Sequence, residues 1–93
     1  MNNLPKITSY GEYSSDNYGV NSLVMDLGDI NIYYSYKTIV AYSDGKDGLV
    51  CSENVWSNTT GKHLNWIQPD KTFRINNSEF MIRLENALKR HIN

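Results

Sequence analysis

Apolar and polar residues alternate most regularly in the first half of the chain. Every second residue from Leu23 to Leu27 is apolar, which is the period of a strand with one buried face. Gly28-Asp29 follows, and a glycine at the first position of a two-residue turn favours a type II′ hairpin. The alternation resumes over residues 30–37 and puts Tyr33 and Tyr34 on opposite faces of a return strand. This hairpin is the clearest structural prediction from the pattern.

Weaker strand patterns lie on both sides of the hairpin. They span residues 7–13, 38–42 and 49–56, with turn-forming stretches at 14–19 and 43–48. We expect the first of these segments to be an edge strand. Near Lys37 the apolar positions shift from even to odd numbers, which predicts a β-bulge or a strand break.

After Pro69-Asp70 the pattern changes to the period of a helix. Asn76 or Ser78 is suited to cap its N-terminus, and Glu79 has the spacing of a capping box relative to Asn76. Apolar residues then recur at helical intervals as far as His91. The end of the chain is therefore expected to be an amphipathic helix.

Together these elements predict an α+β fold. A small antiparallel sheet of three to five strands, arranged as a meander over about residues 7–67, is expected to pack against one C-terminal α-helix over about residues 77–91. The chain has 93 residues, so we expect a single domain, residues 1–93, with a small core. Apolar residues make up 40% and charged residues 20%, which favours a folded chain over a disordered one.

Composition also bears on compartment and cofactors. The single cysteine, Cys51, cannot form an internal disulfide, and no apolar stretch is long enough to cross a bilayer. The N-terminus lacks the pattern of a signal peptide, so we expect a cytoplasmic protein without membrane association. His63, His91 and Cys51 lack the close paired spacing of structural zinc sites. We therefore expect no metal and no other cofactor.

Charge is distributed unevenly along the chain. Residues 1–60 contain three cations and seven acidic residues, a balance of −4, whereas residues 61–93 contain six cations and three acidic residues, a balance of +3. A nucleic-acid-binding protein needs a patch basic enough to neutralise several phosphates. Only the C-terminal third contains enough cations for such a patch.

The phrase TTGKHLNWI, residues 59–67, is the densest group of chemically capable side chains. Its spacing excludes a phosphate-binding P-loop, because the residue five before Gly61 is Trp56 and the residue after Lys62 is His63. His63 beside a threonine hydroxyl permits a base and a nucleophile, but such a pair also needs a third group that orients the base.

A structural interpretation of the phrase is stronger. Gly61 among small polar residues favours a rigid chain reversal with a positive φ at the glycine. Leu64, Trp66 and Ile67 would then lie in the core, with Lys62 and His63 at the rim. The alternative is a loop that binds a partner, since tryptophan and cationic side chains beside a rigid turn suit a binding hot spot. The residues we select as candidates for partner binding are Tyr33, Lys62, His63, Trp66, Lys71 and Arg74.

Three phrases carry a resemblance to known proteins. They are TSYGEYSSDNYG, residues 8–19; YYSYKTIVAY, residues 33–42; and NVWSNTTGKHLNWIQPDK, residues 54–71. Over residues 8–84 the chain resembles a family of short proteins encoded by bacteriophages, prophages and plasmids, whose activity is not settled. The resemblance implies a small mobile-element protein that binds a host protein, and it assigns no catalytic residue.

These observations lead to three hypotheses of function. The leading one is a small non-enzymatic phage or mobile-element protein that inhibits or modulates a host protein, of the anti-CRISPR or another anti-defence type. The alternative is a nucleic-acid-binding accessory protein that uses Lys62, His63, Lys71, Arg74 and the basic end of the C-terminal helix. A small hydrolase centred on His63 is the third. A tyrosine-rich sheet face that no helix covers would also suit a homodimer.

Overall fold

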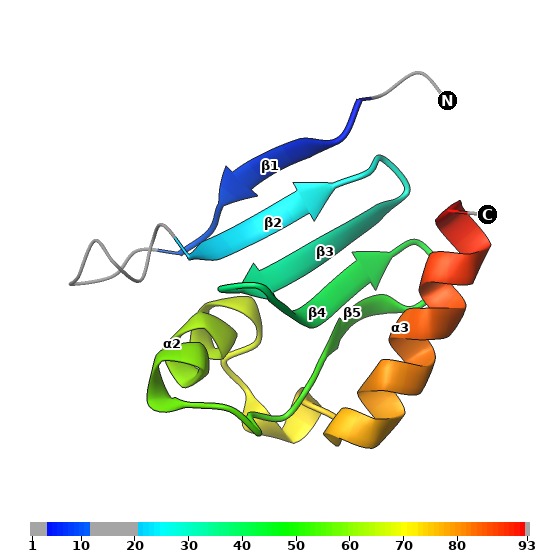
Figure 1. Cartoon of the computed structure of the whole chain (residues 1–93). Helices are drawn as coiled ribbons and strands as arrows, with labels where there is room; N and C mark the ends of the chain where they lie inside the picture. The colour runs from blue at the N-terminus through cyan, green and yellow to red at the C-terminus, as the bar shows by residue number, and fades with distance from the viewer. Residues whose placement is uncertain (1–3, 12–20, 93) are drawn as a thin grey trace.

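The fold is a five-stranded antiparallel sheet with helices packed against it (Figure 1). The computed structural model describes residues 4–11 and 21–92. Within them the elements, in chain order, are β1 (Lys6–Ser9), β2 (Ser22–Asp26), β3 (Ile30–Ser35), β4 (Thr38–Asp44), β5 (Gly48–Cys51), α2 (Asn58–Ile67), the 3-10 turn η1 (Lys71–Phe73) and α3 (Asn77–Ile92). The strands lie side by side in the order of the sequence. This arrangement confirms the predicted α+β fold with an antiparallel meander and a C-terminal helix.

The predicted hairpin joins β2 to β3. Met25 is opposite Ile32 in the register, and the backbone N–H of Leu27 donates to the carbonyl of Ile30 at 3.0 Å. Gly28 has φ 95°, a conformation that residues with a Cβ rarely adopt. The alternating pattern and the turn glycine therefore act together to set this register.

The change of phase near Lys37 has two structural causes. The chain turns between β3 and β4 at Tyr36, which has φ 58° and is held by a 2.8 Å hydrogen bond from its N–H to the carbonyl of Asn21. The register then shifts opposite Tyr33 and Tyr34, so that Val40 is an additional residue in β4. The predicted bulge and the predicted break are both present.

Two of the predicted strands have different bounds. β5 ends at Cys51 instead of continuing to Trp56, because the chain leaves β4 and Ser52 forms a parallel bridge with Ile75 just before α3. β1 is an edge strand, as expected, and is exposed along its length. The rest of the segment predicted as strand 7–13 and the predicted turn at 14–19 extend into residues 12–20, outside the described residues.

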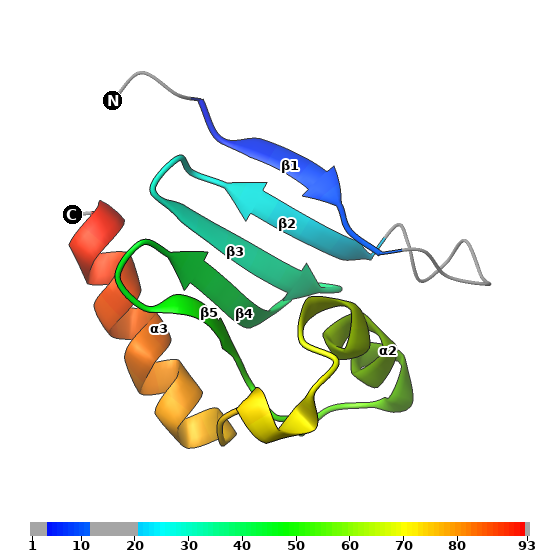
Figure 2. The ribbon, with the colours of Figure 1, turned by 180° about the vertical axis from the view of Figure 1, so that it is seen from behind.

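The core is divided between the two faces of the sheet. On one face Ile32 and Tyr42 pack with Phe80 and Leu84 of α3. The residues packed on the other face are Tyr33, Val40, Ala41, Cys51 and Leu64, the last from α2. Neighbouring residues of a strand point to opposite faces, so α2 and α3 cover opposite faces. Figures 1 and 2 both show the helices beside the β3–β5 half of the sheet, with β1 extending away from them.

The start of α3 allows a direct test of the capping prediction. The side-chain oxygen of Asn76 accepts a hydrogen bond from the N–H of Glu79 at 2.8 Å, so Asn76 is the cap. Replacing Asn76 with alanine is expected to lower the free energy of unfolding by about 1 kcal/mol. The matched change Ser78→Ala, inside the helix, is expected to change it by less than about 0.5 kcal/mol. Urea unfolding of both variants measures the difference, and equal effects would contradict the assignment of the cap.

Candidate binding site on helix α2

The phrase at residues 59–67 is helical, so the predicted rigid chain reversal is wrong. Ser57 caps α2: its backbone is extended, and its hydroxyl accepts a hydrogen bond from the N–H of Thr60 at 3.3 Å. Gly61 lies within the helix and does not have the positive φ expected for it. The predicted extent of the sheet, to about residue 67, is therefore too long.

Helical spacing separates the phrase into two faces. The face at 60, 63, 64 and 67 packs toward the sheet, and Thr60, His63 and Leu64 are buried. His63 is therefore in the core, although we expected it at the rim, and Trp66 is 50% exposed, although we expected it in the core. The face at 58, 61, 62 and 65 points the opposite way. Both sets of residues recur at intervals of three and four, and this spacing in the sequence is the signal that identifies the helix.

A buried polar cluster joins α2 to the end of β3. Ser35 Oγ lies 2.7 Å from His63 Nδ1 and 2.9 Å from Thr60 Oγ1. The rings of Tyr10 and Tyr36 pack against the imidazole, with centroids 6.2 and 5.7 Å away. A serine hydroxyl beside an imidazole is a nucleophile–base pair in some enzymes. Here the three polar residues are at most 5% exposed, so a substrate does not reach Ser35 Oγ in this conformation.

The opposite face of α2 forms one side of an open cleft of about 440 Å³. It is lined by Glu53, Asn54, Asn58, Gly61, Lys62, Asn65, Lys71 and Arg74. The lining side chains are all charged or amide-bearing, apart from the glycine. Three of them are cationic and one is acidic, so the cleft is positively charged.

Hydrogen bonds hold two of the lining residues in place. The guanidinium of Arg74 donates from Nε to the carbonyl of Gln68 at 3.0 Å and from Nη2 to Asn65 Oδ1 at 2.9 Å. Asn54 donates from Nδ2 to the carbonyl of Ser57 at 3.0 Å. A Cβ on Gly61 would lie 3.0 Å from that same Nδ2, so the glycine allows Asn54 to approach the helix closely. Side chains that are ordered before binding lose less entropy when a ligand arrives.

Large aromatic side chains are exposed on the same stretch of chain. Trp56 precedes α2, Trp66 lies near its end, and Phe73 is in η1, with exposed fractions of 37%, 50% and 67%. Tryptophan and arginine are enriched in the residues that contribute most to binding at protein interfaces. Residues 53–74 therefore combine a cationic cleft with exposed aromatic groups.

The six residues predicted to bind a partner differ in their positions in the structure. Lys62, Lys71 and Arg74 line one cleft, and Trp66 is exposed on α2, the helix that also contains Lys62. His63 is fully buried, so its predicted contact with a partner does not fit this structure. The sixth, Tyr33, is half-buried under α2, packed edge-to-face against Tyr10 with 5.7 Å between ring centroids.

Sequence reasoning missed the polar partners of these cations. Asn58 and Asn65 share the helical face of Lys62, which the spacing of the residues indicates once the helix is recognised. Glu53 and Asn54 reach the cleft only because the chain leaves the sheet after Cys51. No local pattern in the sequence marks them.

A second polar cluster holds the end of α3 against the turn between β4 and β5. Arg90 Nη2 lies 2.8 Å from Asp44 Oδ2 and 2.9 Å from Asp47 Oδ2, and His91 Nε2 lies 2.9 Å from Asp44 Oδ2. Burial alone would raise the pKa of Asp44, but hydrogen bonds from the Asp47 backbone, Arg90 and His91 outweigh it and hold the pKa well below its usual range. Burial and the hydrogen bond to Asp47 raise the pKa of Tyr42 to about 12. This cluster is an internal ion network of the fold.

The structure also bears on the cysteine, on metal binding and on membrane insertion. Cys51 is buried, and burial raises the pKa of its thiol to about 11, which keeps it protonated and unreactive at neutral pH. Over residues 4–11 and 21–92, no three histidine, cysteine or acidic side chains are grouped closely enough to hold a metal ion. In the same part of the chain, no helix has the length and apolar character needed to cross a membrane.

The fold and the cleft define a small α+β protein with a cationic, amide-lined surface on its shorter helix. The chain belongs to a family of unknown function, DUF8033, whose model matches residues 5–81. The match includes the described strands, α2, η1 and the first turn of α3. Comparison with curated proteins and with solved structures found no match. Membership in a family without a settled activity agrees with the resemblance, whereas the mobile-element origin stays a prediction.

Proposed function

We propose that this is a non-enzymatic binding protein that uses the face of α2 and η1 to bind an acidic surface of another protein. The observation that carries the proposal is the cationic cleft lined by Lys62, Lys71 and Arg74, on a segment that also exposes two tryptophans and a phenylalanine. Binding there would inhibit or modulate the partner.

The chemistry of the cleft suits acidic side chains. Arg74 is held with its guanidinium at the cleft, and a guanidinium pairs with carboxylates in a fixed geometry. Lys62 and Lys71 add charge that attracts an acidic surface before contact. The amides of Asn58 and Asn65 offer both donors and acceptors, so they can pair with polar groups between the acids.

The kind of partner follows from the resemblance. The phrases at residues 8–19, 33–42 and 54–71 resemble those of phage, prophage and plasmid proteins. Such proteins commonly act on their host by binding one of its proteins. We therefore propose a host protein as the target, with inhibition of a defence system, of the anti-CRISPR or another anti-defence type, as the role.

The cleft also supports a second candidate function, binding of nucleic acid in the host cytoplasm. Two observations favour a protein partner. Arg90 at the end of α3 is paired with Asp44 and Asp47, and Figures 1 and 2 show that end of α3 on the opposite side of the molecule from η1. His63, one of the residues that the nucleic-acid hypothesis requires, is buried. The cations therefore do not form one track along which several phosphates could bind.

Charge reversal in the cleft tests the proposed function. The double variant Lys62→Glu, Lys71→Glu is expected to weaken partner binding by about a hundredfold or more, because each reversal places like charges together. Its free energy of unfolding should stay within about 0.5 kcal/mol of the wild type, since both side chains are exposed. The measurement is recovery of a stoichiometric protein from host lysate by the tagged chain, followed by titration of that protein.

Lys46→Glu is the matched control, because Lys46 is an exposed lysine in the turn between β4 and β5. It should recover the same protein as the wild type. Equal recovery by the cleft variant, or no stoichiometric partner for the wild type, would contradict the proposal. Affinity for DNA or RNA that falls steeply with salt, and is lost in the cleft variant, would support the nucleic-acid alternative in its place.

A further inference from the structure

An apolar hollow of about 310 Å³ lies on the sheet beyond the edge of α3. It is lined by Ile7, Leu23, Met25, Tyr34, Tyr36 and Lys37. The register places Ile7 opposite Met25, and Met25 opposite Ile32, so these side chains share the face that α3 covers farther along the sheet. Ile7 is 60% exposed and Tyr36 is 43% exposed. We call this surface the floor.

The side of α3 that adjoins the floor is also apolar. Arg83 and Arg90 extend toward Asp47, on the β5 side of the helix. At about 100° per residue, Met81, Glu85 and Leu88 lie roughly half a turn away from Arg83 and therefore face β2. A second hollow is lined by these three residues with Ile82 and Leu84. We call this surface the wall.

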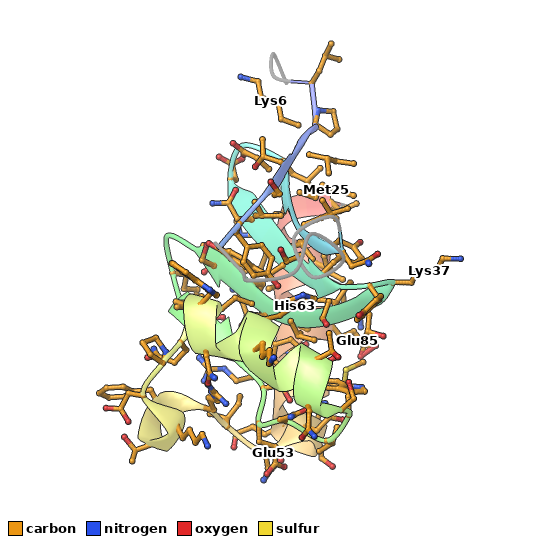
Figure 3. The ribbon with its side chains drawn as sticks, turned by 90° about the vertical axis from the view of Figure 1, so that its left-hand side faces the viewer. Lys6, Met25, Lys37, Glu53, His63 and Glu85 are labelled. Carbon is orange, nitrogen blue, oxygen red and sulfur yellow. The ribbon has the colours of Figure 1, made fainter. Side chains whose placement is uncertain are left out.

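The floor and the wall meet at an angle and form one continuous concave surface, which we call the step. Leu88 of the wall packs against the same core cluster as Met25 and Tyr34 of the floor. Both parts are apolar except for one charged residue each, Lys37 on the floor and Glu85 on the wall. Figure 3 shows Lys37 and Glu85 on the same side of the molecule. The step is about one helix diameter high, because α3 lies directly on the sheet.

We propose that a second copy of this chain occupies the step. In a two-fold symmetric dimer the two α3 helices pack side by side through their walls, and Glu85, at the edge of each wall away from its own sheet, lies over the floor of the other copy. Each Lys37 then meets a Glu85 across the interface, twice by symmetry. This charge complementarity is what selects a second copy, since the one surface contains both members of the pair.

The dimer uses a surface different from the cleft on α2. The two proposals are therefore independent, and Lys37→Glu should leave capture of the cleft's partner unchanged.

Sedimentation equilibrium of the full chain tests the dimer. We expect a mass of twice 10.7 kDa at high concentration. Lys37→Glu and Glu85→Lys should each raise the dissociation constant by about tenfold or more, because each change places two like-charged pairs in the interface. Combining the two changes restores opposite charges and should recover most of the affinity. Lys46→Glu, outside the step, should have no effect.

Met81→Lys supplies a second probe. Met81 is 51% exposed on the wall, so the chain should fold with this change but remain monomeric. Three results would overturn the proposal: a wild-type chain that is monomeric at about 1 mM, a concentration at which even weak specific dimers form; a charge-swapped double variant no better than the single ones; or an unchanged dimer in Met81→Lys.

Discussion

Replacing His63 with alanine is expected to lower the free energy of unfolding by about 3 kcal/mol. The imidazole is fully buried, so its removal leaves a cavity between α2 and the sheet. It also removes the 2.7 Å contact to Ser35 Oγ, whose hydroxyl keeps only Thr60 as a partner in the cluster. Urea unfolding followed by circular dichroism measures the change.

Lys62→Ala is the matched control, one residue away on the exposed face of the same helix. It should change the free energy of unfolding by less than about 0.5 kcal/mol. The two variants should show the reverse order in partner binding: Lys62→Ala weakens it, whereas folded His63→Ala binds as the wild type does. A stable His63→Ala protein that has lost its biological activity would instead support a chemical role for the imidazole.

Replacing Asp44 with asparagine is expected to lower the free energy of unfolding at pH 7 by about 2 kcal/mol. The side chain of Asp44 is fully buried and accepts hydrogen bonds from Arg90 and the Asp47 backbone, and it contacts His91. Asparagine keeps one acceptor oxygen, but it removes the negative charge. Its NH2 group also takes the place of an oxygen that accepts hydrogen bonds in the wild type. Asp29→Asn, an exposed change in the turn between β2 and β3, should have almost no effect.

The same carboxylate should make stability depend on pH. Its pKa is lowered in the folded protein, so its contribution is complete above the unfolded value of about 3.9 and is lost as the pH falls through the lower, folded value. The wild type should therefore lose stability from about pH 5 downward, and Asp44→Asn should lose less over that range. Asp47 and Asp70 also have lowered pKa values, so the variant keeps part of the dependence. Parallel pH profiles for the two proteins would contradict the role of Asp44.

The elements that the sequence predicted well depend on neighbouring residues. The β2–β3 hairpin follows from strict alternation and from Gly28, whose φ of 95° few other residues tolerate. The start of α3 follows from Asn76, which lies one residue before the helix and three before the N–H that it caps. Each of these signals spans only a few residues, and the contacts that realise it are local.

The helix α2 shows where local signals fail. Its first half contains two threonines and a glycine, which have low helix propensity, so the phrase is typical of a turn. The helix nevertheless forms because Ser57 caps it and because Thr60, His63 and Leu64 bury one face against the sheet. Tertiary burial outweighs the propensity, and the buried face includes a histidine that we expected at the surface.

The candidate site, too, could be predicted only in part from the sequence. Lys62, Lys71 and Arg74 could be selected from the sequence because cationic residues beside a tryptophan are suited to binding. Their convergence in one cleft, together with Glu53 and Asn54, could not. It requires the chain to leave the sheet at Cys51 and return beside it at Ile75, after α2 and η1.

The sequence by itself therefore determined the strand order, the register of the β2–β3 hairpin and the C-terminal helix. The signals for these features, the spacing of apolar residues and the helix cap, act within a few residues. The tertiary structure decided that α2 is a helix, that His63 is buried and that the cations share a cleft. It also decided that α3 leaves the β1–β2 half of its sheet face open. These features depend on contacts between residues far apart in the chain, such as Ser35 with His63 and Asp44 with Arg90, which no local pattern encodes.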